Sequence, residues 1–116
     1  MVKRRIVTSK EKEDALIRAI HGGTKLSGSE GLKEVYKARK KLYELLQPVV
    51  EEIAGHYMGR GVSAKDLIKS GNVGIRKALL HYDISKKYKF SSYCTWWIRA
   101  EIHKLLGLPV DSRKPS

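Results

Sequence analysis

The chain is 116 residues long, 41% of its residues are hydrophobic, and 24 Lys and Arg outnumber 12 Asp and Glu, which gives a formal net charge of +12. This apolar content excludes a disordered tail, no apolar run approaches the roughly 20 residues of a membrane-spanning helix, and the single Cys excludes an internal disulfide framework. An isoelectric point near 9.9 in one domain of this size is typical of proteins that bind nucleic acid.

The chain is predicted to be helical throughout, because it has no sustained period-two alternation and no hairpin turn of the Asn-Gly or Asp-Gly kind. The first helix should begin at Thr8 or Ser9, where the run T-S-K-E forms a capping box with Glu11, and should end at Gly22-Gly23. Its apolar face is predicted to consist of Ala15, Leu16, Ala19 and Ile20.

A long amphipathic stretch follows, in which apolar residues recur from Leu32 to Tyr57 at spacings of three and four. Pro48 has no amide hydrogen and disfavours helix at Gln47. We therefore predict a break or kink at this point, which divides the stretch into two helices.

Two further helices complete the prediction. Ser63 should cap the first of them, with Asp66 as an acidic partner in the first turn. The second should begin at Ser91 or Ser92 and reach about Leu106. The prediction is thus an all-α fold, a compact bundle of about five helices over residues 1–107, followed by a flexible C-terminal tail over residues 108–116.

The sequence offers little for catalysis. Its four histidines show no metal-ligand spacing, Cys94 has no CxxC partner, and neither a phosphate-binding GxxxxGK[ST] loop nor a GxSxG elbow is present. We therefore expect a protein that is not an enzyme and that needs neither a metal nor a cofactor. The single cysteine and the lack of an apolar signal region favour a cytoplasmic location.

The last predicted helix carries an unusual set of side chains. On a helical wheel its polar and aromatic strip consists of Tyr93, Trp96, Ala100 and His103, with Trp97 at the edge. The opposite side, predicted to face the core, consists of Cys94, Ile98, Ile102 and Leu105. Cations surround the strip at Lys86, Lys89 and Arg99, and aromatic faces among cations are how proteins hold unstacked bases. The alternative is that Tyr93 and Trp97 fill the space between helices.

These residues belong to a longer motif. The run DLIKSGNVGIRKALLHYDISKKYKFSSYCTWWIRAEI (Asp66–Ile102) closely resembles the second conserved region of the sigma-70 family, the promoter-recognition subunits of bacterial RNA polymerase. GRGVSAKDLI (Gly59–Ile68) continues the resemblance upstream, and TSKEKEDALIRAIHGG (Thr8–Gly23) is similar to the family's preceding region, 1.2.

The resemblance implies two surfaces. The first would capture flipped bases on the non-template strand of the promoter minus-ten element, with Tyr93 stacking on the flipped adenine and Trp96 and Trp97 abutting the duplex end. Its implied DNA-binding residues are Tyr82, Asp83, Lys86, Lys89, Ser92, Tyr93, Trp96, Trp97, Arg99, Ala100 and His103. The second would dock on the coiled coil of the largest subunit of core RNA polymerase. Its implied residues are Asp66, Leu67, Lys69, Ser70, Asn72 and Arg76.

The sequence departs from the family pattern in three places. Lys69-Ser70 replaces a pair that is often acidic, which puts the strength of polymerase docking in doubt. Ala100 replaces a glutamine that reads the upstream base pair, with His103 near the second reader, so the base preference there is open. The C-terminal regions of the family, including the helix-turn-helix, are absent after Gly107. The chain is therefore either a fragment or a short sigma-like protein, such as a phage would encode, which relies on another partner for upstream DNA. An anti-sigma or accessory protein is a further expected partner.

Three functional interpretations remain. The first is a transcription initiation factor domain that docks on core polymerase and melts the minus-ten element, in a bacterial, nucleoid-associated setting. The alternative is a sigma-like interaction protein that occupies or recruits polymerase without opening promoters. A generic single-strand binder would explain the aromatic strip but gives no reason for the DLIKSGNVG segment.

Overall fold

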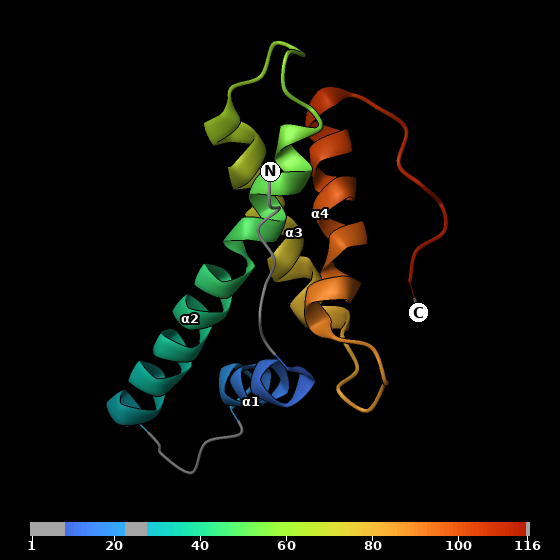
Figure 1. The fold of residues 1–116 in the computed structure, drawn as a ribbon. Coiled ribbons are helices and arrows are strands. Elements are labelled where there is room, and N and C mark those ends of the chain that lie inside the picture. The colour runs from blue at the N-terminus through green and yellow to red at the C-terminus, as the bar shows by residue number, and fades with distance from the viewer. Residues whose placement is uncertain (1–8, 23–27, 116) are drawn as a thin grey trace.

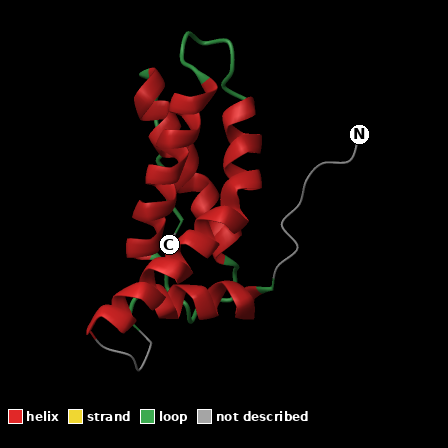
Figure 2. Cartoon of the chain, turned by 90° about the vertical axis from the view of Figure 1, so that its left-hand side faces the viewer, coloured by secondary structure: helices red, strands yellow, loops and turns green. Residues whose placement is uncertain are grey.

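The computed structural model describes residues 9–22 and 28–115. Over these residues it contains four helices and no strand, which confirms the all-α prediction, whereas the predicted number of about five helices is one too many. The helices are α1 (Lys10–Ile20), α2 (Gly28–Gly55), α3 (Ala64–His81) and α4 (Phe90–Leu106). Helices α2, α3 and α4 lie side by side (Figure 1), and α1 crosses one end of this group (Figure 2).

The predicted break at Pro48 is wrong, because α2 is a single helix of 28 residues with Pro48 inside it. The side chains of Leu46 and Val50, on either side of the proline, are both fully buried. They belong to one apolar stripe that runs the length of the helix. Burial of the whole stripe offsets the one backbone hydrogen bond that Pro48 cannot make.

Two of the predicted helix caps are present, and a third is replaced. Ser9 accepts a hydrogen bond from the Lys12 amide, and Ser63 accepts one from the Asp66 amide, each at 3.2 Å. The predicted start of the last helix at Ser91 or Ser92 is wrong, since α4 begins at Phe90 without a side-chain cap from its own chain neighbours. Thr8, the other predicted start of the first helix, lies outside the described residues.

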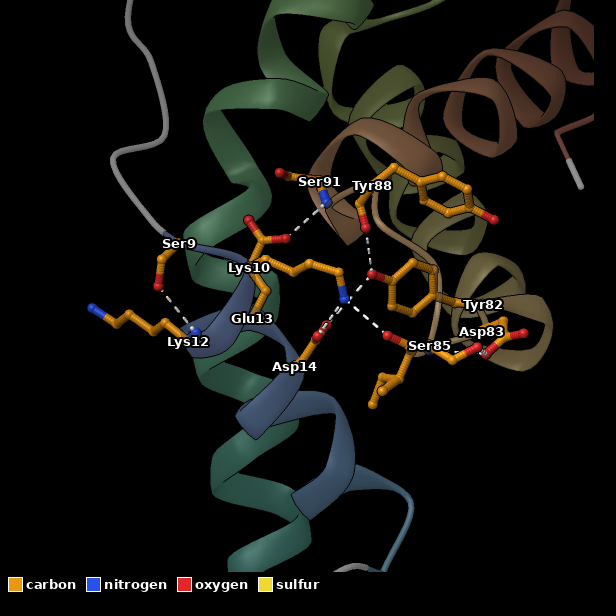
Figure 3. Close-up of polar contacts among 11 residues, drawn as sticks. Ser9, Lys10, Lys12, Glu13, Asp14, Tyr82, Asp83, Ser85, Tyr88 and Ser91 are labelled. Carbon is orange, nitrogen blue, oxygen red and sulfur yellow. Dashed lines mark hydrogen bonds and ion pairs between the residues drawn. The ribbon is translucent and has the colours of Figure 1, made fainter.

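The missing cap of α4 comes from α1. Glu13, which is only 1% exposed, accepts a hydrogen bond from the backbone amide of Ser91 through Oε1 at 3.1 Å (Figure 3). An amide in the first turn of a helix has no partner within the helix, so a carboxylate there both accepts its hydrogen and complements the helix dipole. This contact fixes α4 against α1.

The predicted apolar face of α1 is confirmed for Ile20, which is buried, and for Leu16 and Ala19, which pack against the core, but the buried face includes residues that were not predicted. Ile17 and Ile20 are buried together with Glu13 and Asp14, whereas Ala15 is exposed. The two acidic residues are drawn inside because they bind α4 and the loop before it. A prediction from α1 alone places acidic residues in solvent, because their hydrogen-bond partners belong to other segments of the chain.

Two glycines let α3 pack closely against its neighbours, Gly74 against the backbone of α4 and Gly71 against a side chain of α2. A Cβ atom on Gly74 would stand 2.6 Å from the Trp97 carbonyl oxygen and 2.7 Å from the Ile98 Cα. A Cβ atom on Gly71 would stand 2.7 Å from the Val50 side chain. The glycines that weaken α3 as an isolated helix are therefore what allow α4 to lie directly against it.

The core side of α4 is largely as predicted. Cys94, Ile98 and Ile102 are fully buried. The prediction for Leu105 is wrong, because this side chain is 43% exposed and Leu106 packs against the core in its place.

Candidate nucleic-acid interface

Six ring side chains form a continuous row along the start of α4, the end of α3 and the loop between them. We call this the aromatic row; it consists of His81, Tyr82, Tyr88, Tyr93, Trp96 and Trp97. Tyr88 and Tyr93 stack with ring centroids 5.6 Å apart and an interplanar angle of 3°. His81 stacks on Trp97 at 4.7 Å and 10°, and Trp96 meets Trp97 edge-on at 5.2 Å.

The prediction that Tyr93 points outward is wrong. Its side chain is 6% exposed, since the rings of Tyr82, Tyr88 and Phe90 surround it within 6.3 Å. Burial raises the pKa of the Tyr93 hydroxyl, while Trp97 acts in the opposite direction. A helical wheel of α4 does not contain this result, because two of the rings that cover Tyr93, those of Tyr82 and Tyr88, come from the end of α3 and from the loop.

The two tryptophans differ in exposure. Trp97 is 6% exposed, so the interpretation that it fills space between helices holds for this residue, and its indole nitrogen finds no hydrogen-bond partner in the described residues. Trp96 is half-buried against the core, and its indole N–H donates to the Asp111 carbonyl oxygen at 3.2 Å. Trp96 therefore forms the more accessible part of the row.

The loop before α4 is tied to α1. The Tyr82 hydroxyl donates to the Tyr88 carbonyl oxygen at 2.8 Å, which closes the loop at its base (Figure 3). Lys10 pairs with Asp14 and donates to the Ile84 carbonyl oxygen at 2.9 Å. Through these contacts α1 holds the loop that supplies two members of the aromatic row.

The Asp83 carboxylate forms its hydrogen bonds within the loop. Its Oδ1 accepts from the Ser85 amide at 2.9 Å and from the Ser85 hydroxyl at 2.7 Å. These hydrogen bonds hold the pKa of the Asp83 carboxyl below its usual value. The loop therefore presents the negative charge of exposed Asp83 together with the positive charges of exposed Lys86 and Lys87 and half-buried Lys89.

Four of the predicted site residues, Trp96 among them, meet at one cavity toward the other end of α4. Arg99, Ala100 and His103 line a cavity of about 170 Å³ together with Trp96, Tyr57, Val110 and Asp111. His103 Nδ1 lies 2.7 Å from the Pro109 carbonyl oxygen, which can only accept, so this nitrogen donates. Nε2 of the neutral ring then accepts from the Tyr57 hydroxyl at 2.7 Å. The ring of His103 is thereby fixed in orientation.

The predicted polymerase-docking residues all lie on α3, and three of them, Lys69, Asn72 and Arg76, line a groove between α3 and α2. A groove of about 450 Å³ is lined by Tyr36, Arg39, Lys40, Tyr43, Lys69, Asn72, Val73 and Arg76. Asn72 Oδ1 accepts a hydrogen bond from Gln47 Nε2 at 2.9 Å, which joins the two helices at the groove. Asp66 is exposed at the start of α3, Ser70 is half-buried, and Leu67 is fully buried and supports the surface from inside.

The groove combines apolar and basic groups. Tyr36 is 70% exposed, and four cationic side chains line the same hollow. Burial raises the pKa of the Tyr43 hydroxyl, and the positive charges of Arg39 and Arg76 oppose this shift. A groove of this composition is suited to a partner that presents both apolar and acidic side chains.

Sequence reasoning missed several residues of both surfaces. Tyr88 and His81 join the aromatic row, Tyr57 holds His103, and Arg39 and Lys40 extend the groove onto α2. Tyr88 lies between two lysines in the run K-Y-K-F, and this pattern of an aromatic residue among cations could have identified it. The other four lie in segments whose side chains reach the two surfaces only in the folded chain.

Two classes of site find no support in the described part of the chain. No group of three or more His, Cys, Asp or Glu side chains over residues 9–22 and 28–115 is placed to hold a metal ion. Among the same residues, no helix has the length and apolar character required to cross a bilayer.

Comparison with known proteins identifies the family. The family model described as Sigma-70 region 2 matches residues 42–107, which is more than half of the chain. RNA polymerase sigma factor SigA of Clostridium acetobutylicum is 48% identical over 70 residues, which cover 60% of this chain and 18% of that protein. RNA polymerase sigma factor RpoS of Coxiella burnetii is 35% identical over 111 residues, covering 90% of this chain and 32% of that protein.

A third relative extends the same pattern. RNA polymerase sigma factor SigA of Lactococcus lactis subsp. cremoris is 38% identical over 99 residues, covering 85% of this chain and 25% of that protein. The chain thus spans about a fifth to a third of the length of these relatives. The matched residues contain α3, α4 and the aromatic row between them, so the chain belongs to the sigma-70 family through its region 2.

Proposed function

We propose that the chain acts in transcription initiation as a sigma factor domain that docks on core bacterial RNA polymerase and holds the minus-ten element open. The observation that carries the proposal is the aromatic row within the segment that matches region 2. A row of rings beside exposed cations suits single-stranded nucleic acid, since each stacked base contributes roughly 1–3 kcal/mol and the cations bind its phosphates.

Roles within the row follow from exposure and position. Trp96, Arg99 and His103 would contact the upstream edge of the melted strand, because they share one cavity at the far end of α4. Lys86 and Lys89 would bind the backbone at the loop. Buried Tyr93 and Trp97 would serve either as the wall of a base pocket or as stacking partners after local opening.

In vitro transcription tests this proposal. The chain and the matching segment of the Clostridium acetobutylicum relative, as a positive control, are added separately to one bacterial core polymerase on a minus-ten template. Permanganate footprinting then reports unpaired thymines. We expect opening at the minus-ten element with both proteins. Opening with the control alone, while the chain still binds the polymerase, would favour the alternative of a protein that occupies polymerase without melting promoters.

The second surface has its own test. Arg76→Glu and Lys69→Glu, both at the groove, should weaken retention of core polymerase by the immobilised chain at least fivefold, because they reverse charge at the proposed contact. Arg18→Glu, an exposed change on α1, is the matched control and should have little effect. Equal retention by all three variants would show that docking runs through another surface.

The alternative interaction protein rests on one specific observation. The groove between α2 and α3 is lined by four cations, whereas Lys69-Ser70 stands where the family often has an acidic pair. A basic groove would select an acidic surface on its partner, which is opposite in charge to the surface that an acidic pair would select. Both functions include binding to polymerase, so the footprinting experiment, and not the charge reversals, separates them.

A further inference from the structure

The segment that follows α4 lies back along the same helix. Gly107 ends α4 in the left-handed conformation, with φ of 71°, and the Leu108 amide donates to the His103 carbonyl oxygen at 2.8 Å. Such a glycine-centred end turns the chain away from the helix axis. Figure 1 shows the segment descending beside α4 toward the end where α4 begins.

Four contacts join residues 109–115 to α4 in reverse order. The Pro109 carbonyl accepts from His103, and the Asp111 carbonyl accepts from the Trp96 indole N–H at 3.2 Å. The Lys114 ammonium stands 4.8 Å from the centroid of the Trp97 ring, and Pro115 lines a hollow with Tyr88, Ser92 and Tyr93. From His103 at its start to Ser92 and Tyr93 at its end, the segment therefore runs antiparallel to α4.

These contacts occupy the groups that a nucleic acid would need. A base cannot stack on the accessible side of Trp97 while an ammonium group stands there, and the Trp96 N–H is already bonded. From this we infer that residues 109–115 are a removable cover that competes with single-stranded nucleic acid for the aromatic row. The inference rests on the proposed function of that row.

The cover is held by contacts that can exchange with solvent. Residues 109–114 are exposed, and the Arg113 guanidinium binds the carboxylate of its own neighbour, Asp111, at 3.1 and 3.2 Å rather than a helix residue. Because that pair is internal to the cover, it shapes the segment without fastening it to α4. A ligand that offers stacking and phosphates can therefore displace the segment.

A rearranged segment tests the cover without changing charge or length. The full chain is prepared with residues 109–115, PVDSRKP, reordered as KSPDVPR, so that composition is kept while the two side-chain contacts, of Lys114 with Trp97 and of Pro115 with the hollow beside Tyr93, are lost. The exchange E11K/K12E, on the exposed side of α1, is the matched control. Since Trp96 and Trp97 are the only two tryptophans of the sequence, quenching of tryptophan fluorescence by acrylamide reports on this row alone.

Binding of a fluorescein-labelled, A/T-rich single-stranded oligonucleotide is measured beside the quenching. Apparent affinity is reduced by the fraction of molecules that are competent to bind, so a cover that is closed in most molecules predicts about three- to tenfold tighter binding by the rearranged chain. Acrylamide should also quench its tryptophans more strongly. The control exchange should match the original chain in both measurements.

The two measurements distinguish three outcomes: no cover, a cover that does not compete with nucleic acid, and no binding of nucleic acid at all. Equal quenching of rearranged and original chains would overturn the cover. Stronger quenching with unchanged or weaker oligonucleotide binding would overturn the competition, while binding by the original chain would leave the proposed function standing. Absence of binding by every chain, with the row uncovered, would instead refute the proposed function together with the competition.

Discussion

Glu13 is the residue on which the placement of α4 most depends. Its carboxylate is buried, accepts from the Ser91 amide, and leaves its Oε2 atom without a hydrogen-bond partner in the described part of the chain. The same environment acts on Cys94, whose thiol pKa is raised to about 12, first by burial and then by the charge of Glu13. The thiol is therefore protonated and unreactive at neutral pH.

Replacing Glu13 should measurably destabilise the fold. Glu13→Ala removes the acceptor of the Ser91 amide and leaves that donor unsatisfied, so we expect a loss of about 2 kcal/mol in the free energy of unfolding. Glu13→Gln keeps an acceptor at Oε1 and should cost less. Urea denaturation measures both. Glu11→Ala, at an exposed position of α1, should stay within about 0.5 kcal/mol, and an equal loss there would contradict the capping role.

Tyr93 and Trp96 should respond differently to truncation. Tyr93 is buried, so Tyr93→Ala should cost about 3 kcal/mol, in the range measured for large-to-small core substitutions. Trp96 is half-buried, so Trp96→Ala should lower the free energy of unfolding by only about 1 kcal/mol. The same substitution should lower oligonucleotide affinity at least fivefold, because it removes a stacking ring. Thermal unfolding and fluorescence anisotropy test the pair. A loss of binding by Trp96→Ala that only follows its folded fraction would mean that Trp96 is structural.

At the scale of the elements, the α3–α4 contact decides where the aromatic row lies. Gly74 lets the backbones touch beside Trp97, and His81, at the end of α3, then stacks on the Trp97 ring. An ion pair spans the same two helices, since Lys77 donates to Glu101 at 2.9 Å and Lys104 adds a second contact at 3.2 Å. The position of the aromatic row therefore depends on the close packing of α3 against α4.

Gly74→Ala should separate these helices. Its Cβ would lie within 2.8 Å of three backbone atoms of α4, which cannot move aside as a flexible side chain can, so we expect destabilisation of more than about 2 kcal/mol. The matched control is Gly55→Ala, another helical glycine, whose added Cβ would meet nothing within 4 Å. Urea denaturation compares the two. Similar midpoints would show that α3 and α4 have room to part.

The Glu101 bridge predicts a dependence of stability on pH. Burial alone would raise the pKa of Glu101, but hydrogen bonds from Lys77 and Lys104 outweigh it and hold the pKa below the ordinary 4.5. A carboxyl whose pKa is lowered on folding stabilises the protein above its unfolded pKa, and this contribution is lost as pH falls through the folded pKa. Solvent screening of the partly exposed lysines limits it to about 0.5–1 kcal/mol.

Glu101→Gln is the test of this linkage. The stability difference between the original chain and this variant should be constant above about pH 5.5 and should shrink as the pH falls below 4.5. Chemical denaturation at a series of pH values measures it. A difference that does not change between pH 3 and pH 7 would mean that the ion pair contributes nothing.

At the scale of the whole molecule, charge sets how the protein meets its partners. The net charge of +12 attracts any polyanion. Cations lie at two surfaces, beside the aromatic row and in the basic groove, so a polyanion can bind at either. Charge by itself carries little sequence information, so specificity for one DNA strand has to come from the rings and the polar groups around them.

Binding of single-stranded DNA should therefore depend steeply on salt. If about five phosphates are neutralised, the logarithm of the binding constant should fall with the logarithm of salt concentration at a slope of roughly −3.5. Anisotropy titrations at several salt concentrations give the slope. A slope near zero would refute electrostatic binding, and equal affinity for the non-template strand and its complement would point to a binder without strand preference.

Much of this protein was determined by the sequence alone. The all-α class, the serine caps of α1 and α3, and the buried positions of Cys94, Ile98 and Ile102 follow from local propensity and helical spacing, which act within a few residues. The membership of the sigma-70 family was recognisable from one continuous motif, because the residues of that motif are adjacent along the chain.

Only the tertiary structure decided the rest. Pro48 stays within one helix because packing along the whole of α2 outweighs a single lost hydrogen bond, and α4 begins early because a carboxylate from α1 caps it. Tyr93 is buried because the rings of Tyr82 and Tyr88, from the end of α3 and from the loop before α4, cover it. In each case the decisive partner lies outside the helix concerned, and the periodicity of one helix contains no information about the groups that other segments bring to it.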